Sequence, residues 1–156
     1  MCGAGNDCQH PVDAAYLSSW IAGFDALLTN VTSTFTNVYV NLVSTLDLSN
    51  VARIQRSTVF CAIEHKYLLK ECGCIDRGNA TELVQLDENV HTFDAALKQL
   101  AGKWQAQLKA QGREDIAIVY QDFMEGVGAS LDMSFLNSLD CFHPSTRGHE
   151  MLAVSV

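Results

Sequence analysis

Two short segments of this chain have the composition of β-strands, and the long helical stretch between them restricts the folds it can adopt. Residues 37–43 and 115–120 are almost continuously apolar and rich in β-branched and aromatic side chains, which is typical of buried parallel strands. Residues 12–31 and 82–110 repeat apolar side chains at helical spacing. Strands joined through helices predict a parallel sheet with right-handed crossovers and helices on both faces.

Local signals set the expected ends of the other elements. Pro11 is suited to the first position of a helix, where its missing N–H is not needed. Gly112 is a stop signal for the long helix that precedes it. We expect one or two short helices in residues 51–71, a loop in residues 72–79, and a final short helix capped by Ser145.

The composition is that of a globular protein, with 48% hydrophobic and 18% charged residues. We therefore predict a single domain over residues 1–156. Two parallel strands rarely make a self-sufficient sheet, and Met1 is not followed by the basic and apolar segments of a signal peptide. We expect the chain to be the C-terminal portion of a larger domain that folds poorly alone.

The cysteines and two glycosylation sequons indicate the cellular environment. The chain has six cysteines, and Asn30 and Asn79 each begin an Asn-x-Thr sequon. Both features favour an oxidising, secretory environment with disulfides over a reduced cytosolic chain with chance sequons. The spacing does not select a pairing.

A metal site is the alternative use of these cysteines. Cys61, Cys72 and Cys74 with His10 and His65 could form a ligand set, but Cys-x-Cys lacks the usual finger spacing and has no matching second pair. Disulfides need fewer assumptions, so we predict no metal. His65 itself has the sequence context of a surface or partly buried helix residue.

The net charge of −8 argues against nucleic acid as a partner, because binding a polyphosphate would meet electrostatic repulsion. No Lys/Arg-rich cluster is present for an anionic membrane surface. No apolar run reaches the roughly 20 residues of a membrane span. A neutral or zwitterionic substrate fits this charge better.

Asp140 and His143 are the candidate catalytic residues, three positions apart in the loop after the last predicted strand. Active sites of open α/β sheets gather at the carboxyl ends of strands. A carboxylate beside an imidazole fixes its tautomer, so that the imidazole can take a proton from a serine hydroxyl. The alternative is a structural histidine that caps the following helix.

The sequence around this pair resembles the last conserved block of the SGNH (GDSL) hydrolases, in which Asp-x-x-His supplies the catalytic Asp and His. Residues 140–149, with Cys-Phe between the pair and Ser-x-x-Gly-His after it, are similar to the phospholipase B branch. Residues 112–123 and 131–135 also resemble that branch. Cys61 with Cys72-x-Cys74 looks like its cysteine pattern.

At the other end, Ala4-Gly5-Asn6-Asp7 resembles the Gly-x-Asn-Asp block of the same family. The resemblance implies that Asn6 donates its side-chain amide to the oxyanion, a contact worth about 2.7–4 kcal/mol in comparable sites. Ala4 replaces the first glycine and Cys8 follows Asp7 directly, which departs from the family pattern. An ordinary Asx turn is the alternative for Asn6.

The chain has no segment that resembles the Gly-Asp-Ser nucleophile block or the family's glycine oxyanion block. The resemblance therefore implies a partial three-layer, flavodoxin-like α/β SGNH fold, with Asp140 and His143 but no nucleophile. The parent protein is expected to hydrolyse phospholipid or lysophospholipid esters outside the cell, without a cofactor. A non-catalytic secreted binding module and an esterase for non-lipid esters remain open.

Overall fold

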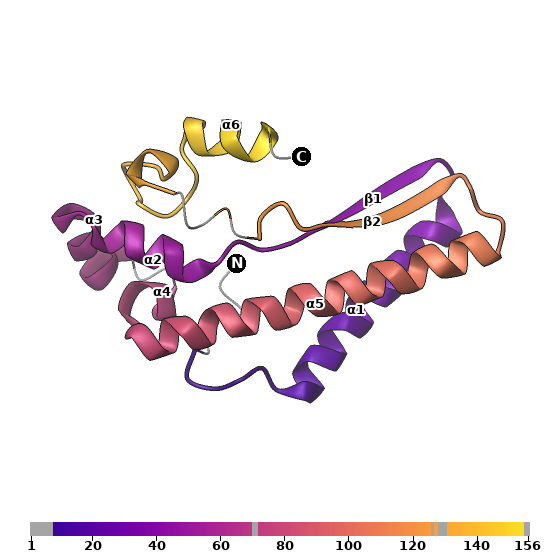
Figure 1. Ribbon diagram of the computed structural model, residues 1–156, viewed down its shortest axis with the longest axis horizontal. Coiled ribbons are helices and arrows are strands. Elements are labelled where there is room, and N and C mark those ends of the chain that lie inside the picture. The colour runs from indigo at the N-terminus through magenta and orange to yellow at the C-terminus, as the bar shows by residue number, and fades with distance from the viewer. Residues whose placement is uncertain (1–7, 70–71, 126, 128–130, 155–156) are drawn as a thin grey trace. The chain divides into compact units, whose positions relative to one another are not determined.

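The computed structural model describes most of the chain, namely residues 8–69, 72–125, 127 and 131–154. Asn6 lies outside the described residues. The described elements are mostly helical and include one two-stranded parallel sheet (Figure 1). The chain divides into two compact units. Unit 1 comprises residues 1–11, 45–90 and 123–156, and unit 2 comprises residues 12–44 and 91–122.

Unit 2 contains two helices and both strands. Its elements are α1 (Ala14–Thr34), β1 (Val38–Val43), β2 (Ile116–Gln121) and the greater part of α5 (Ala80–Ala110). One apolar cluster joins all four elements; its buried side chains are Leu28, Leu42, Leu97, Leu100, Ala101, Trp104, Leu108, Ile116 and Ile118. The predicted helical stripe of residues 82–110 is confirmed, because its apolar positions from Leu86 to Leu108 are buried.

The two strands pair in parallel, as their sequences predict. Val38 lies opposite Ile116, and the register continues to Val43 opposite Gln121. The prediction that both strands are fully buried is wrong for the described structure, because Tyr39 is 62% exposed. The apolar cluster covers one face of the sheet, so the other face meets solvent despite its apolar sequence.

Helix α1 begins later than the sequence predicts. Pro11 does not open the helix; instead Asp13 is the N-cap, and its carboxylate accepts a hydrogen bond from the backbone N–H of Tyr16 at 2.8 Å. An acidic side chain satisfies the free N–H groups of a first turn and complements the helix dipole. At the other end of α5, Gly112 adopts φ 66° and stops the helix as predicted.

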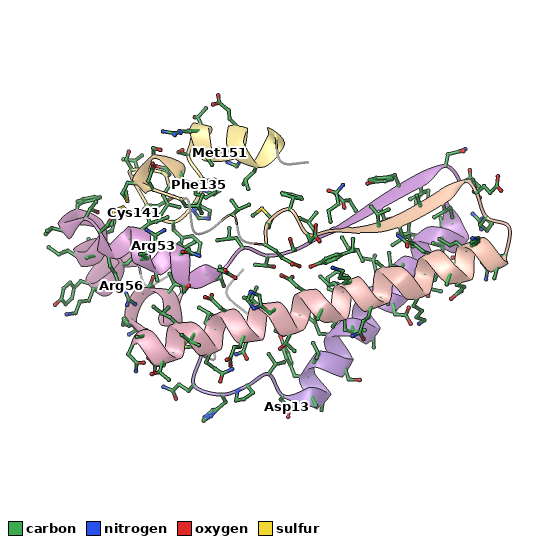
Figure 2. The ribbon with its side chains drawn as sticks, in the orientation of Figure 1. Asp13, Arg53, Arg56, Phe135, Cys141 and Met151 are labelled. Carbon is green, nitrogen blue, oxygen red and sulfur yellow. A yellow bond between two sulfur atoms is a disulfide. The ribbon has the colours of Figure 1, made fainter. Side chains whose placement is uncertain are left out.

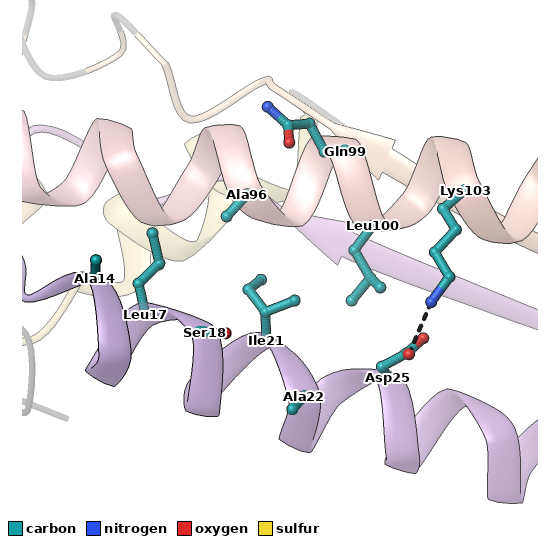
Figure 3. A pocket seen from close by; sticks show the side chains of 10 residues that line it. All are labelled: Ala14, Leu17, Ser18, Ile21, Ala22, Asp25, Ala96, Gln99, Leu100 and Lys103. Atoms are coloured by element: carbon teal, nitrogen blue, oxygen red, sulfur yellow. Dashed lines mark hydrogen bonds and ion pairs between the residues drawn. The ribbon is translucent and has the colours of Figure 1, made fainter.

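Asp25 makes the principal polar contact between α1 and α5. One carboxylate oxygen accepts a hydrogen bond from the indole N–H of Trp104 at 2.8 Å. The other pairs with the ammonium group of Lys103 at 2.8 Å (Figure 3). Hydrogen bonding from Lys103 and Trp104 lowers the pKa of Asp25, although burial opposes the shift. The buried indole N–H therefore has its acceptor, as buried polar groups require.

Unit 1 is built from short helices around a second apolar cluster. Its elements besides the start of α5 are α2 (Leu48–Arg56), α3 (Val59–Glu64), the π-helix η2 (His65–Leu69), α4 (Gly73–Arg77), the 3-10 helix η4 (Met133–Phe135) and α6 (Thr146–Val154). The cluster contains side chains of all the α-helices except α3. The predicted short helices of residues 51–71 and the final short helix are confirmed.

Two arginines of α2 connect distant segments of unit 1 (Figure 2). The guanidinium group of Arg53 donates to the backbone carbonyl of Leu131 at 3.1 Å. Arg56 donates to the carbonyls of Ile75 at 2.9 Å and Gly78 at 2.8 Å. Arg53 thus satisfies a backbone acceptor in an irregular segment, and Arg56 satisfies carbonyls in the last turn of α4 and directly after it.

The segment predicted as a loop at residues 72–79 is largely helical. Helix α4 occupies Gly73–Arg77, and Cys74 within it forms a disulfide with Cys8, 66 residues earlier in the sequence. Glycine and closely spaced cysteines are weak helix formers. The tertiary cross-link and the burial of Ile75 at 0% exposure override that local preference.

We predict that Asp25→Ala lowers the free energy of unfolding by about 1–2 kcal/mol, because the buried Trp104 N–H loses its acceptor. Asp25→Asn keeps an acceptor and should lose less. The matched control is Asp122→Ala, since Asp122 is 65% exposed and lies 3.8 Å from Lys98, a pair worth less than about 0.5 kcal/mol. Urea unfolding followed by Trp fluorescence measures all three, and equal losses for Asp25→Ala and Asp122→Ala would contradict the prediction.

Candidate functional site

A closed loop carries Asp140 and His143 in unit 1. Its two sides meet in an antiparallel bridge between Leu136 and Pro144. Inside that bridge, the backbone N–H of Asn137 donates to the carbonyl oxygen of His143 at 2.8 Å. The turn between these residues is therefore held at its base by backbone hydrogen bonds.

Helix α6 begins immediately after this loop and is packed closely against it. Ser145 caps the helix as predicted: its hydroxyl accepts the backbone N–H of Gly148 at 3.1 Å, and its own N–H donates to the carbonyl of Phe135 at 2.7 Å. A Cβ atom at position 148 would overlap the Phe135 carbonyl oxygen. Glycine is thus required for the helix to approach the loop this closely.

The Asp140 carboxylate organises the turn through both of its oxygens. Oδ1 accepts the backbone N–H groups of Phe142 at 2.9 Å and His143 at 3.0 Å. Oδ2 lies 3.0 Å from Nδ1 of His143. This Asx-type turn fixes the histidine backbone and its ring with one side chain.

The electrostatic balance at Asp140 favours the carboxylate. Burial pushes its pKa up, but the hydrogen bonds from the backbone N–H groups of Phe142 and His143, together with the His143 side chain, outweigh burial and lower the pKa. Hydrogen bonds to the charged form are a general cause of such a decrease. Asp140 is thus ionised at neutral pH and acts as an acceptor for the imidazole.

Cys141, between Asp140 and Phe142, has a backbone conformation that is uncommon for a residue with a side chain. Its φ is 51°, in the left-handed region, and its side chain is fully buried. A disulfide joins it to Cys61 of α3 (Cys141 is labelled in Figure 2). Non-glycine residues in this region cost about 1 kcal/mol or more, which the surrounding cross-link and hydrogen bonds must offset.

His143 presents the free end of its ring to solvent. Its side chain is 64% exposed. Among the described residues, Nε2 has no hydrogen-bond partner, whereas Nδ1 faces Asp140. An imidazole that donates Nδ1–H to a carboxylate carries its lone pair on Nε2, so this nitrogen can accept a proton from a hydroxyl group.

His65 is more deeply buried than its sequence predicts. It was expected at the surface or partly buried, but it is 1% exposed. Its Nδ1 lies 3.0 Å from Oδ1 of Asp76, and its Nε2 lies 2.6 Å from the backbone carbonyl oxygen of Asp140. The sequence did not predict the contact between His65 and Asp76, because it predicts a loop where the structure has helix α4.

The other predicted site residues lie on separate elements or outside the described residues. Asn6, the predicted oxyanion donor, is outside them. Asn30 is exposed on α1. Asn79 is exposed at the start of α5, where its side chain accepts the backbone N–H groups of Thr81 and Glu82 at 2.9 and 3.1 Å. Glu82 in turn accepts the backbone N–H of Asn79, which completes a capping box.

The cysteines of the alternative metal site are used in disulfides. Cys61 is joined to Cys141 and Cys74 to Cys8, and Cys72 is also disulfide-bonded. The sequence prediction of disulfides is confirmed, although the pairing was not predictable. Within the described residues, no group of three or more His, Cys, Asp or Glu side chains is placed to hold a metal ion.

A groove of about 640 Å³ between α1 and α5 in unit 2 is a separate surface feature (Figure 3). Apolar side chains such as Leu17, Ile21 and Leu100 form much of its wall, and the Asp25–Lys103 ion pair closes one end. Its acid and base neutralise each other and hold the two helices. The groove therefore contains no group prepared for proton transfer.

None of the described helices combines the length and the apolar character required to cross a bilayer. The chain matches no protein-family model and no solved structure. It is similar to curated sequences named "Phospholipase B1, membrane-associated". Identity is 29% to the rat protein over 76% of this chain, 29% to the human protein over 98%, and 23% to the mouse protein over 96%.

These similarities support a phospholipase B-like relationship at low identity. The chain spans only 8% of the rat protein and 10% of the human and mouse proteins. The activity of the whole relatives therefore enters only as a proposal for this chain.

We predict that Asp140→Asn lowers the free energy of unfolding by about 1–2 kcal/mol at neutral pH, because the hydrogen bonds to a charged acceptor are weakened. Folding lowers the pKa of Asp140 from its ordinary 3.8. Its carboxylate thus stabilises the folded chain above pH 3.8, and this contribution is lost as the pH falls through the lowered value.

The measurement is the urea midpoint of wild type and Asp140→Asn across an acid pH series, where the difference should shrink below pH 3.8. Glu150→Gln on α6 is the control, because Glu150 is exposed. A difference that stays constant or grows at low pH would contradict the assigned role of the carboxylate.

Proposed function

We propose that this chain supplies the Asp–His part of a serine carboxylic ester hydrolase site, within a partial three-layer SGNH-type α/β domain. The observation that carries the proposal is the Asp140–His143 geometry. A carboxylate orients Nδ1 of the ring at 3.0 Å, and Nε2 is open to solvent. This is the arrangement that general-base activation of a hydroxyl nucleophile requires.

In the proposed mechanism, His143 takes the proton from a serine hydroxyl as the serine attacks the ester carbonyl. It then returns that proton to the leaving alcohol. Asp140 stabilises the imidazolium formed between these steps. The serine comes from a segment outside residues 1–156, and Asn6 donates to the oxyanion. His143 then takes a proton from water as the water attacks the acyl-serine carbonyl, and it returns that proton to the serine oxygen as the carboxylic acid leaves. No metal or organic cofactor takes part.

We propose a phospholipid or lysophospholipid as the substrate. The low-identity similarity to phospholipase B1 supports a lipid ester. A run of apolar side chains on α3 and η2 also supports it, because Cys61 within this run is joined by a disulfide to Cys141 beside the pair. The exposed side chains are Val59, Phe60, Ile63, Tyr67, Leu68 and Leu69. Such a surface suits peripheral contact with a lipid interface.

We also propose that the parent protein acts in the secretory pathway or outside the cell, as a glycoprotein. Two disulfides in the described residues support an oxidising environment. Asn30 and Asn79 are both exposed, which glycosylation requires. At Asn79 the oxygen of the amide caps α5, while the nitrogen is the atom that would carry a glycan.

The central test compares purified residues 1–156 with the full product of the gene that encodes them, using lysophosphatidylcholine as substrate. We expect hydrolysis by the full product and little or none by residues 1–156, because the nucleophile segment is absent from the latter. His143→Ala in the full product should lower kcat by at least about 10³-fold. Asp140→Ala should lower it by a similar order.

The matched control for this test is His149→Ala, since His149 is an exposed histidine of α6 and should leave kcat unchanged. Full activity in His143→Ala would contradict the proposal. A secretory leader that ends directly before Cys2 in the gene product, together with no hydrolysis of any ester, would favour the non-catalytic binding module. Turnover of short soluble esters without turnover of lipids would favour a non-lipid esterase.

A second prediction concerns the apolar run on α3 and η2. We expect the double variant Phe60→Ser, Leu68→Ser to reduce the bound fraction on phosphatidylcholine vesicles at least about tenfold, because each lost apolar contact costs on the order of 1 kcal/mol. Flotation of the vesicles measures it. Leu27→Ser on α1 removes an exposed apolar side chain outside this run and is the control; equal binding of both variants would contradict a docking role for this run.

A further inference from the structure

A second, buried Asp–His pair in unit 1 contacts the backbone of the candidate catalytic pair. The side chains of His65 and Asp76 are 2% and 0% exposed, with Nδ1 and Oδ1 3.0 Å apart. His65 follows α3, while Asp76 belongs to α4. Burial of two ionisable groups is costly unless each is paired and hydrogen-bonded, so this pair needs an explanation.

The hydrogen-bond partners of His65 define its protonation. Nε2 lies 2.6 Å from the backbone carbonyl oxygen of Asp140, which can only accept. Nδ1 faces the Asp76 carboxylate, whose other oxygen accepts the backbone N–H of Cys72 at 3.0 Å. Because this carbonyl has no proton to give, Nε2 of His65 must carry an N–H, and Nδ1 and the Asp76 carboxylate share the proton between them.

The remaining polar neighbour of the ring is compatible with this assignment. The side-chain amide of Gln55 lies 3.4 Å from Nε2 of His65. Amide orientation follows from the hydrogen-bond network, and a half-turn of the amide directs its oxygen toward the ring N–H. The ring of Phe142, 6.2 Å from the His65 ring between centroids, lies next to the pair and carries no charge.

His65 thus acts on the same residue that orients His143. The carbonyl of Asp140 accepts from His65, while the carboxylate of Asp140 contacts His143 at 3.0 Å. The peptide that begins at this carbonyl leads into Cys141, whose φ is 51°. Cys61, four residues before His65, forms the disulfide with Cys141. One helical segment therefore holds the strained turn by a covalent link and by a hydrogen bond.

We propose that His65, oriented by Asp76, is a positioning residue for the Asp140–His143 pair. By donating Nε2–H to the Asp140 carbonyl, it fixes the peptide plane at the turn and thereby the direction of the carboxylate toward Nδ1 of His143. The catalytic meaning of this positioning rests on the proposed ester hydrolysis. The positioning itself is a property of the folded chain and is measurable without a substrate.

The test uses ¹⁵N-labelled residues 1–156 and the ring ¹H–¹⁵N spectra of the histidines. In wild type at neutral pH, we expect Nε2 of His65 to carry a proton, and neutral His143 to be in its Nδ1–H tautomer. His91 and His149 are exposed and serve as internal references. A His65 ring without a proton on Nε2 in the wild-type spectrum would overturn the proposal with no variant needed.

Two variants separate positioning from a purely structural role. In Asp76→Asn, Nδ1 of a neutral His65 can accept a hydrogen bond from the new amide, so Nε2 keeps its proton. The His143 tautomer should therefore be unchanged. The double variant His65→Phe, Asp76→Leu replaces the buried pair by apolar side chains, which generally preserves folding, but removes the donor. There, His143 should shift toward the Nε2–H tautomer of an unrestrained imidazole.

An unchanged His143 tautomer in the folded double variant would overturn the proposal. In the active full gene product, the same double variant should lower kcat by on the order of 10²-fold with little change in KM, as expected for a misplaced catalytic group. Retained activity in His143→Ala would instead reject ester hydrolysis and leave the spectroscopic result standing. Failure of the positioning proposal and failure of the proposed ester hydrolysis therefore give different results.

Discussion

Asp140 is the residue on which the geometry of the candidate site depends. Its carboxylate accepts two backbone N–H groups and contacts the His143 ring, while its carbonyl accepts from His65. One residue thus links a buried segment to an exposed side chain. Because His143 is 64% exposed, packing alone cannot fix its ring, and these directional contacts have to do so.

The environment around the turn divides into a rigid inner side and an open outer side. On the inner side, Cys141 and His65 are buried and connected to α3, η2 and α4. On the outer side, Nε2 of His143 meets solvent. A proton acceptor needs both properties, since a rigid support preserves direction and an open nitrogen admits a reacting hydroxyl. Among the described residues, Asp140 and His143 combine these two properties.

The sequence predicted the long-range architecture of unit 2 better than the contacts of unit 1. The periodic spacing of apolar residues predicts the buried stripe of α5 and the parallel pairing of residues 37–43 with 115–120. The backbone preference of glycine predicts the end of the helix at Gly112. The three-layer SGNH fold stays a prediction. Burial of His65 was missed because its partner Asp76 lies on a helix that forms through tertiary contacts and a disulfide. Periodicity does not report polar partners, and the disulfide pairing has no local signal.

The placement of the cysteines along the chain sets an order of assembly. Cys8 can join Cys74 as soon as both are synthesised, but Cys61 must wait for Cys141, 80 residues later in the sequence. At ordinary rates of synthesis this leaves the Cys61 thiol without its final partner for several seconds at least, about 4–16 s. During that interval Cys72 and Cys74 are the cysteines nearest to it in the sequence, and a wrong pair would need thiol exchange to be undone. The turn that carries Asp140 and His143 is therefore among the last parts of the chain to become covalently complete.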